Sequence, residues 1–223
     1  MLLKLANEDL GYDGEVVLRN FSVAIAPGER VALVGESGAG KSTLLSVLQA
    51  RFHDKAALIP QAPGLVRSLS VFHNVYMGRL HVNPTWYNLL NLAWPRRKEI
   101  EAIRPLVRRL GLEEKLFERA GALSGGQQQR TAVCRALFQG GASVLGDEPV
   151  SAVDSHQARS ILNALCETFP TVVLAMHDVE LAIAYSSRVI GLKQGVIALD
   201  EPSAGLTPTD LDFLYKEADG ARH

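Results

Sequence analysis

The chain has 223 residues, of which 47% are hydrophobic, and its formal net charge is −1. That length allows one well-buried domain, and the near-neutral charge argues against direct binding of nucleic acid through bulk electrostatics. No window approaches the run of about 20 apolar residues that a membrane helix needs, and the N-terminus turns polar too early for a signal peptide. Cys134 and Cys166 fit no metal or redox spacing, and we expect both to be buried, reduced thiols.

The first third of the chain is expected to contain short strands and one long helix. Short apolar runs flank a turn at Pro27-Gly28 and favour strands on both sides of it. A glycine-rich loop then leads into a segment with helical periodicity. The predicted strands are 2–5, 21–25, 30–34 and 57–59, and the predicted helix is 41–52.

The middle of the chain lacks strand patterns. Residues 70–110 have a helical period that is interrupted near Pro84 and Pro95. Another helix is predicted at 124–138. Because the strand-free stretch lies between core elements, we expect residues from about 70–121 to form a helical lobe inserted into the core.

The last third alternates strands with helices, as parallel strands with crossover helices do. The predicted strands are 143–145, 171–176 and 189–192, and the predicted helices are 155–168 and 178–186. We therefore expect an α/β fold: a P-loop NTPase core with a mostly parallel sheet, flanking helices and a small N-terminal antiparallel β lobe. One domain would cover 1–223, with core and β lobe at about 1–69 and 122–223. Leu199–Pro202 is expected to be a surface turn.

Residues 35–42 match the phosphate-binding pattern G-x-x-x-x-G-K-[ST] without a mismatch, between a predicted strand and a predicted helix. In such a loop, backbone N–H groups converge on phosphate oxygens, and the helix N-terminus adds partial positive charge. We expect Lys41 to reach the β and γ phosphates of ATP and Ser42 to ligate Mg²⁺. The candidate nucleotide-binding residues of this loop are Gly35, Glu36, Ser37, Gly38, Ala39, Gly40, Lys41, Ser42 and Thr43.

A second helix start has the features of an anion site. Ser124 and Gln127 have the spacing of a capping box, and Gly125 and Gly126 leave the backbone between them uncovered. The helix N-terminus there would attract a phosphate. An ordinary capped helix is the structural alternative, but two phosphate-seeking helix starts in one chain favour a nucleotide-binding function.

The run Leu123–Gln127 reads LSGGQ and resembles the signature of the ATP-binding cassette family. The resemblance implies that Ser124, Gly125, Gly126 and Gln127 contact the γ-phosphate of ATP held by the P-loop of a second chain. Two chains would then form a homodimer on binding ATP and enclose two ATP molecules.

The resemblance extends to residues that would carry out hydrolysis. Asp147, at the end of a hydrophobic run, would hold Mg²⁺, and Glu148 would polarise the attacking water as a general base. Residues 151–154 resemble the loop that communicates across the dimer. His177 resembles the switch histidine that contacts the γ-phosphate.

Two further positions follow from the resemblance. Tyr12 resembles the aromatic residue that stacks on adenine, and Gln61 the glutamine that touches Mg²⁺ and senses the membrane partner. Only 20 positions separate Lys41 from Gln61. Family members usually have a longer stretch here, so we expect part of the antiparallel β lobe to be missing.

The family implies a transport ATPase that drives a permease, peripheral to the cytoplasmic face of the inner membrane, with a solute-binding protein acting from outside. Residues 74–90 and 206–215 resemble the ATP-binding subunits of phosphonate importers. The alternative is a soluble ATPase of the same type that acts on nucleic acid or ribosomal components. Such proteins usually have two cassettes or a long coiled-coil insert, and this chain has one cassette.

Overall fold

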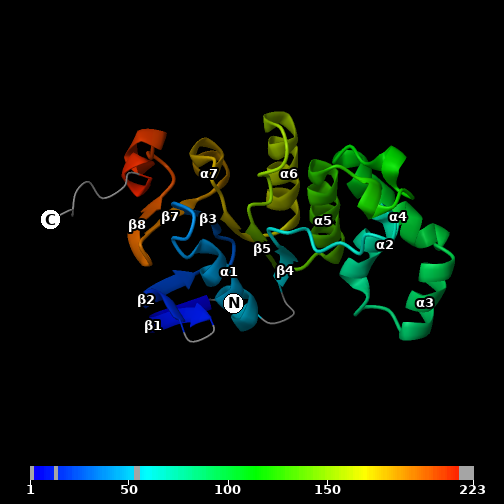
Figure 1. The fold of residues 1–223 in the computed structure, drawn as a ribbon, viewed down its shortest axis with the longest axis horizontal. Helices are drawn as coiled ribbons and strands as arrows, with labels where there is room; N and C mark the ends of the chain where they lie inside the picture. The colour runs from blue at the N-terminus through cyan, green and yellow to red at the C-terminus, as the bar shows by residue number, and fades with distance from the viewer. Residues whose placement is uncertain (1–2, 13–14, 53–55, 216–223) are drawn as a thin grey trace.

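In the part of the chain that the structure describes, the central sheet has six strands, in the order β4-β5-β6-β3-β7-β8 (Figure 1). The computed structural model describes residues 3–12, 15–52 and 56–215. Neighbouring strands from β4 to β7 are parallel, and β8 pairs antiparallel to β7. The expected mostly parallel α/β sheet is therefore confirmed. The strands are β3 (Arg30–Val34), β4 (Ala56–Ile59), β5 (Ser143–Asp147), β6 (Thr171–Ala175), β7 (Arg188–Lys193) and β8 (Val196–Pro202).

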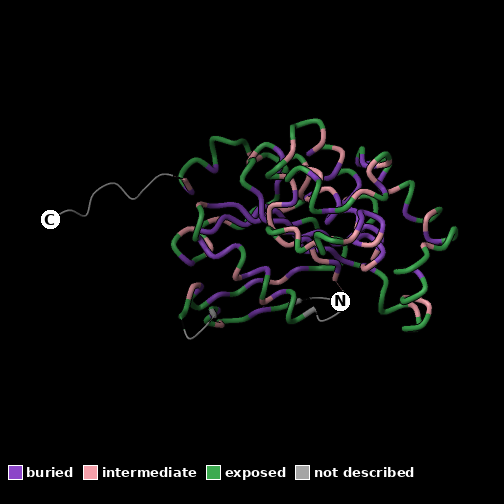
Figure 2. The backbone as a smooth tube through the Cα atoms, turned by 45° about the vertical axis from the view of Figure 1, so that its right-hand side comes forward, coloured by how far each residue is buried: buried purple, intermediate pink, exposed green. Residues whose placement is uncertain are grey.

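Helices cover both faces of this sheet because its inner strands are apolar on both sides. In β3, Val31 and Leu33 join one buried cluster, and Ala32 and Val34 join the other. Helix α1 (Lys41–Phe52) packs on the first face, and three helices pack on the second (Figure 1). Buried residues are concentrated in the interior between these layers (Figure 2). These three are α5 (Gly125–Gln139), α6 (Ser155–Thr168) and α7 (Val179–Tyr185).

A two-stranded antiparallel sheet of β1 (Leu3–Tyr12) and β2 (Glu15–Ile25) lies beside α1. Both strands extend well beyond the short strands predicted from the sequence. The reason is local irregularity: Asn7 in β1 and Asn20 in β2 have φ values of 52° and 46°, and the register shifts there interrupt the period-two pattern. Within the described residues this antiparallel sheet has only two strands, in line with the short connection from Lys41 to Gln61.

The segment between β4 and α5 is helical, as predicted, and lies at the opposite end of the molecule from β8 (Figure 1). Pro84 caps α3, and α4 begins just after Pro95, so the two predicted interruptions are confirmed. No helix in the described part of the chain is long and apolar enough to span a bilayer. The segment contains α2 (Val71–Tyr76), α3 (Thr85–Ala93), α4 (Arg97–Arg109) and the 3-10 helices η2 (Met77–Arg79), η3 (Glu113–Lys115) and η4 (Ala120–Ala122).

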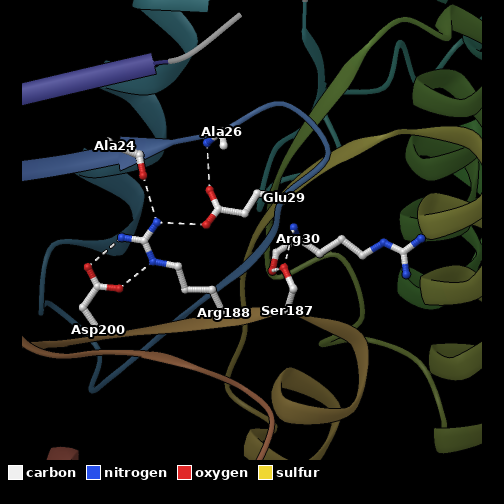
Figure 3. Close-up of polar contacts among 7 residues, drawn as sticks. All are labelled: Ala24, Ala26, Glu29, Arg30, Ser187, Arg188 and Asp200. Atoms are coloured by element: carbon white, nitrogen blue, oxygen red, sulfur yellow. Dashed lines mark hydrogen bonds and ion pairs between the residues drawn. The ribbon is translucent and has the colours of Figure 1, made fainter.

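One arginine ties the β2–β3 turn to the far end of the central sheet (Figure 3). Arg188 binds both carboxylate oxygens of Asp200, at 2.6 and 2.7 Å, and donates to Glu29 and to the carbonyl of Ala24. The Glu29 carboxylate in turn accepts the backbone N–H of Ala26. These contacts raise the pKa of Arg188, with the Asp200 hydrogen bonds as the largest cause. The cluster fixes the β1–β2 hairpin to β7 and β8.

Two expectations are wrong. Leu199–Pro202 belongs to strand β8 rather than to a turn, because Gln194 and Gly195 adopt φ values of 50° and 79° and fold the chain into a hairpin after β7. Cys166 is only partly buried, whereas Cys134 is fully buried, and burial raises the pKa of the Cys134 thiol to about 12.

Candidate active site

The strand order brings the candidate residues to one edge of the sheet. Ligands of open α/β sheets bind at the carboxyl ends of the strands. Strands β4, β5, β6 and β3 are consecutive neighbours. The loops that follow them carry Gln61, Glu148, His177 and the P-loop at 35–42, respectively. Residues that are up to 142 positions apart in the sequence are therefore placed on one rim.

A cavity of about 640 Å³ opens at this rim beside the P-loop. It joins the P-loop to Gln61 and Glu148, two of the candidate site residues, and to residues of the β1–β2 hairpin. Its lining residues are Gly11, Val17, Ser37, Gly38, Gly40, Lys41, Ser42, Thr43, Ser46, Val47, Ala50, Gln61 and Glu148. The volume and the lining suit a phosphorylated ligand of nucleotide size.

Lys41 is the buried cation of the loop, with 5% of its surface exposed. Its Nζ donates to the carbonyl oxygens of Gly35 and Glu36, at 2.7 and 2.9 Å. Burial lowers the pKa of Lys41, and the nearby carboxylates of Glu148 and Asp147 act in the opposite direction. The ammonium group is thus held at the loop by the backbone, where it can face a phosphate.

Gly40 lets the loop approach the β1–β2 hairpin closely. Its φ is 104°, and a Cβ atom there would collide with the side chain of Leu18 in β2. The hairpin therefore forms a wall of the cavity, to which it contributes Gly11 and Val17. Tyr12, the candidate for adenine stacking, follows Gly11 and pairs with Glu15 in the hairpin, but its side chain lies outside the described part of the structure.

The Asp147 carboxylate, at the end of β5, has a buried oxygen atom, Oδ1, without a hydrogen-bond partner among the described residues. The described residues contain no cluster of three or more His, Cys, Asp or Glu side chains that could hold a metal ion. Mg²⁺ is commonly held by one or two carboxylates together with substrate phosphates. Asp147, whose carboxylate is close enough to Lys41 to raise the pKa of that lysine, fits that arrangement.

Glu148 and His177 meet at the adjacent ends of β5 and β6. The Nε2 atom of His177 lies 2.6 Å from Oε1 of Glu148, and the two side chains are 42% and 16% exposed. Glu148 lines the cavity beside the P-loop, and both residues line a second cavity of about 460 Å³ next to it. The carboxylate is therefore oriented and lies beside the phosphate loop, which is the geometry that a general base requires.

The candidate signature residues form a separate feature. The Ser124 side chain accepts the N–H of Gln127, and the Gln127 side chain accepts the N–H of Ser124, so the predicted capping box is confirmed. Ser124 and Gly125 are exposed. None of the residues that line the P-loop cavity comes from α5. Within the described chain, the structure does not bring the signature to the P-loop.

Several residues that line or support the cavity were not predicted from the sequence. The first turns of α1 add Ser46, Val47 and Ala50 to the cavity wall, and helical spacing from Thr43 marks this face in the sequence. Tyr215 accepts the backbone N–H of Gly35 at 3.2 Å. No sequence signal marks that contact, because 180 positions separate the two residues.

Comparisons with known proteins agree with this site. A family model described as ABC transporter matches residues 18–151. The chain is 38% identical to the phosphonates import ATP-binding protein PhnC 1 of Pseudomonas savastanoi pv. phaseolicola, over 96% of this chain and 92% of that protein. The corresponding protein of Pseudomonas aeruginosa is 35% identical, with 96% and 91% covered.

The fold is similar to that of solved cassettes. The dimeric structure of MJ0796, a bacterial ABC transporter cassette, gives a TM-score of 0.79 with 26% identity over 92% of this chain and all of that one. A dimeric post-hydrolysis state of the MJ0796 cassette, bound to ADP and Pi, gives a TM-score of 0.73 with 25% identity over the same shares. With the P-loop, the signature motif and the family match on one chain, this protein belongs to the ABC transporter family as an ATP-binding, ATP-hydrolysing subunit.

Proposed function

We propose that this chain powers the import of phosphonates through a membrane permease by hydrolysing MgATP in a homodimer. The observation that carries the substrate class is the 35–38% identity to phosphonate-import ATP-binding proteins over nearly the whole chain. This similarity favours a transport subunit over a soluble ATPase acting on nucleic acid or ribosomal components. We treat residues 1–223 as one ATPase domain, with the segment of about 70–121 as its helical lobe.

The chemistry follows from the rim of the sheet. The P-loop N–H groups and Lys41 bind the phosphates of ATP, while Ser42, Asp147 and Gln61 would hold Mg²⁺, which neutralises developing charge on the phosphates. Glu148 accepts a proton from the attacking water. His177 keeps the Glu148 carboxylate in place and lies where it can contact the γ-phosphate.

The site is completed by a second chain. The exposed signature turn at Ser124 and Gly125 takes no part in the cavity of its own chain. Each P-loop therefore faces the Ser124–Gln127 turn of the partner, and hydrolysis is a property of the dimer. A helix N-terminus contributes about 0.3–2 kcal/mol to a nearby anion, so ATP itself has to hold the two chains together.

The permease binds the helical segment. An apolar groove of about 350 Å³ lies between α2 and α3, and Trp86, Leu89 and Leu90 of α3 are exposed beside it. The loop from Gln61 to Leu69 joins this groove to the nucleotide cavity. Docking there places the chain at the cytoplasmic face of the inner membrane as a peripheral subunit, with a solute-binding protein delivering the phosphonate from the other side.

Reconstitution in proteoliposomes tests this function. The chain is combined with a phosphonate permease and its binding protein, and ATP hydrolysis is measured with an alkylphosphonate and with the alkylsulfonate of the same shape. We expect the phosphonate to stimulate hydrolysis several-fold and the sulfonate to have no effect. Stimulation by an unrelated class of solute, and not by phosphonates, would overturn the substrate assignment.

A further inference from the structure

Gln129 is a buried glutamine for which the proposed mechanism has no use. It lies in the second turn of α5 with 3% of its surface exposed, close to apolar residues such as Ala132 and Val133 on the same helix. A buried amide is costly unless it forms hydrogen bonds. The Gln129 Nε2 atom donates to the backbone carbonyl oxygen of Glu148 at 3.0 Å. The amide therefore contacts the backbone of the candidate general base.

The backbone of Glu148 is in an unusual conformation. Its φ is 51°, and among the described residues only Asn7, Asn20 and Gln194 are other non-glycine residues with positive φ. Side chains longer than Asn or Asp rarely adopt this region, and such conformations persist where surrounding contacts fix them. The direction of the Glu148 carboxylate depends on this conformation being kept.

Few hydrogen bonds hold the Glu148 backbone in this conformation. The Glu148 N–H donates to the carbonyl of Ala175 at 3.1 Å, and the Glu148 carbonyl accepts from the backbone and hydroxyl of Ser151, at 3.3 and 3.1 Å. Both Ser151 bonds lie within the same local turn. Among the described residues, Gln129 supplies the only side-chain hydrogen bond to this carbonyl that comes from a helix outside the turn.

The start of α5 also touches the loop that follows Glu148. A Cβ atom on Gly126 would lie 2.6 Å from the carbonyl oxygen of Ala152, so the helix and the loop are in direct backbone contact. Ser124 and Gln129 belong to the first and second turns of one helix. A displacement of the signature turn is therefore transmitted to Glu148 through a single rigid element.

We infer that Gln129 is a positioning residue for Glu148, and that α5 links the two ATP sites of the dimer. Its first turn faces the ATP of the partner, and its second turn holds the general base that acts on ATP in its own chain. This inference rests on the proposed function, because it assumes that Glu148 is the base and that the signature acts on the partner's nucleotide.

A split between turnover and binding tests the positioning role. Gln129→Met keeps the size and burial of the side chain and removes the donor. We expect at least a tenfold lower kcat, with the KM for ATP and the affinity for a fluorescent ATP analogue within twofold of wild type. The matched control is Thr131→Val, which removes another buried polar group from α5. Its hydroxyl donates to the carbonyl of Gln127 in the same helix, and we expect the variant to keep kcat. An unchanged kcat in Gln129→Met would overturn the inference.

A mixed dimer shows which site the residue serves. A small amount of chain with wild-type Glu148 is mixed with an excess of Glu148→Gln chain, so that almost all turnover comes from P-loops of the minor chain. Gln129→Met in the minor chain should lower hydrolysis tenfold, and the same change in the excess chain should leave it within twofold. An equal or larger loss from the excess chain would overturn the assignment to Glu148. Absence of ATP hydrolysis by wild-type protein would instead refute the proposed function itself.

Discussion

The Nε2 atom of His177 lies 2.6 Å from the Oε1 atom of Glu148, across 29 positions of sequence. The contact exists because β5 and β6 are adjacent parallel strands that end at the same level. It gives the Glu148 carboxylate a fixed direction beside the P-loop cavity. An oriented carboxylate next to a phosphate site is the basis of the first prediction.

Glu148→Gln should keep ATP binding and lose most turnover. The amide can still contact His177 but cannot accept a proton, and loss of a general base costs about 10²- to 10⁴-fold in rate. We expect the variant to accumulate as an ATP-bound dimer in size-exclusion chromatography with MgATP. Near-normal steady-state hydrolysis would show that Glu148 is not the base.

Lys41→Ala should weaken ATP binding itself. It removes the buried cation of the loop, and a hydrogen bond to a charged group contributes about 1.5–3 kcal/mol, or roughly 10- to 150-fold in Kd. Titration with a fluorescent ATP analogue measures the change. Lys98→Ala, which changes an exposed lysine of α4 away from the cavity, serves as the control and should bind like wild type. Wild-type affinity in Lys41→Ala would contradict the assignment of the P-loop.

Lys41→Ala and Ser124→Arg should complement each other. Each is expected to be nearly inactive alone, because every site of either homodimer carries a lesion. In a mixed dimer one site carries both lesions and the other carries none, so mixing should restore part of the ATPase activity. Wild-type activity should also rise with protein concentration before it levels off. Full activity of Ser124→Arg at every concentration would rule out a role for the signature in trans.

Tyr215→Phe should reduce ATP affinity slightly. The hydroxyl of Tyr215 accepts the N–H of Gly35, and a hydrogen bond of this kind contributes about 1 kcal/mol. We expect the Kd for ATP to rise up to about fivefold in the same fluorescence titration. Tyr87→Phe removes a tyrosine hydroxyl that donates to Glu99 in the helical segment, and it should leave the Kd unchanged. If the two variants change the Kd for ATP equally, the Tyr215 hydroxyl does not help to hold the P-loop in its binding conformation.

Arg188→Met should destabilise the fold without a direct effect on the nucleotide site. The guanidinium has four acceptors and is largely buried, so its loss should cost about 2 kcal/mol and lower Tm by about 4–8 °C. Arg30, whose side chain points away from the cluster in Figure 3, is the control, and Arg30→Met should change Tm much less. Differential scanning fluorimetry compares them, and similar melting of both variants would show that the cluster contributes little.

The sequence reveals those parts of the site that are contiguous. The P-loop is an unbroken motif between a strand and a helix, and the Ser124–Gln127 capping box is local, so both were predicted correctly in structure. Contacts that join distant elements were not predicted. The carbonyl of Glu148 and the amide of Gln129, like Gly35 and Tyr215, meet only because the sheet order brings their elements together.

The errors in the fold prediction have the same physical origin. Period-two alternation finds a strand only while its pairing is regular. The irregularity at Asn7 therefore ended the first predicted strand early, and the one at Asn20 made the second begin late. Strand β8 was missed because its last three residues, Asp200, Glu201 and Pro202, are all exposed, so that this end of the strand resembles a surface turn. The roles of Gln61, Tyr12 and the metal ligands rest on the family resemblance and are proposals for experiment.

Strand β8 has one more consequence, since it is the last strand in the order of the central sheet. An open sheet edge presents unpaired backbone groups that can recruit a strand from another molecule, and natural proteins protect such edges with charged residues and proline. Strand β8 ends with Asp200, Glu201 and Pro202, which combine both forms of protection. These residues therefore disfavour the pairing of two copies of the chain through β8.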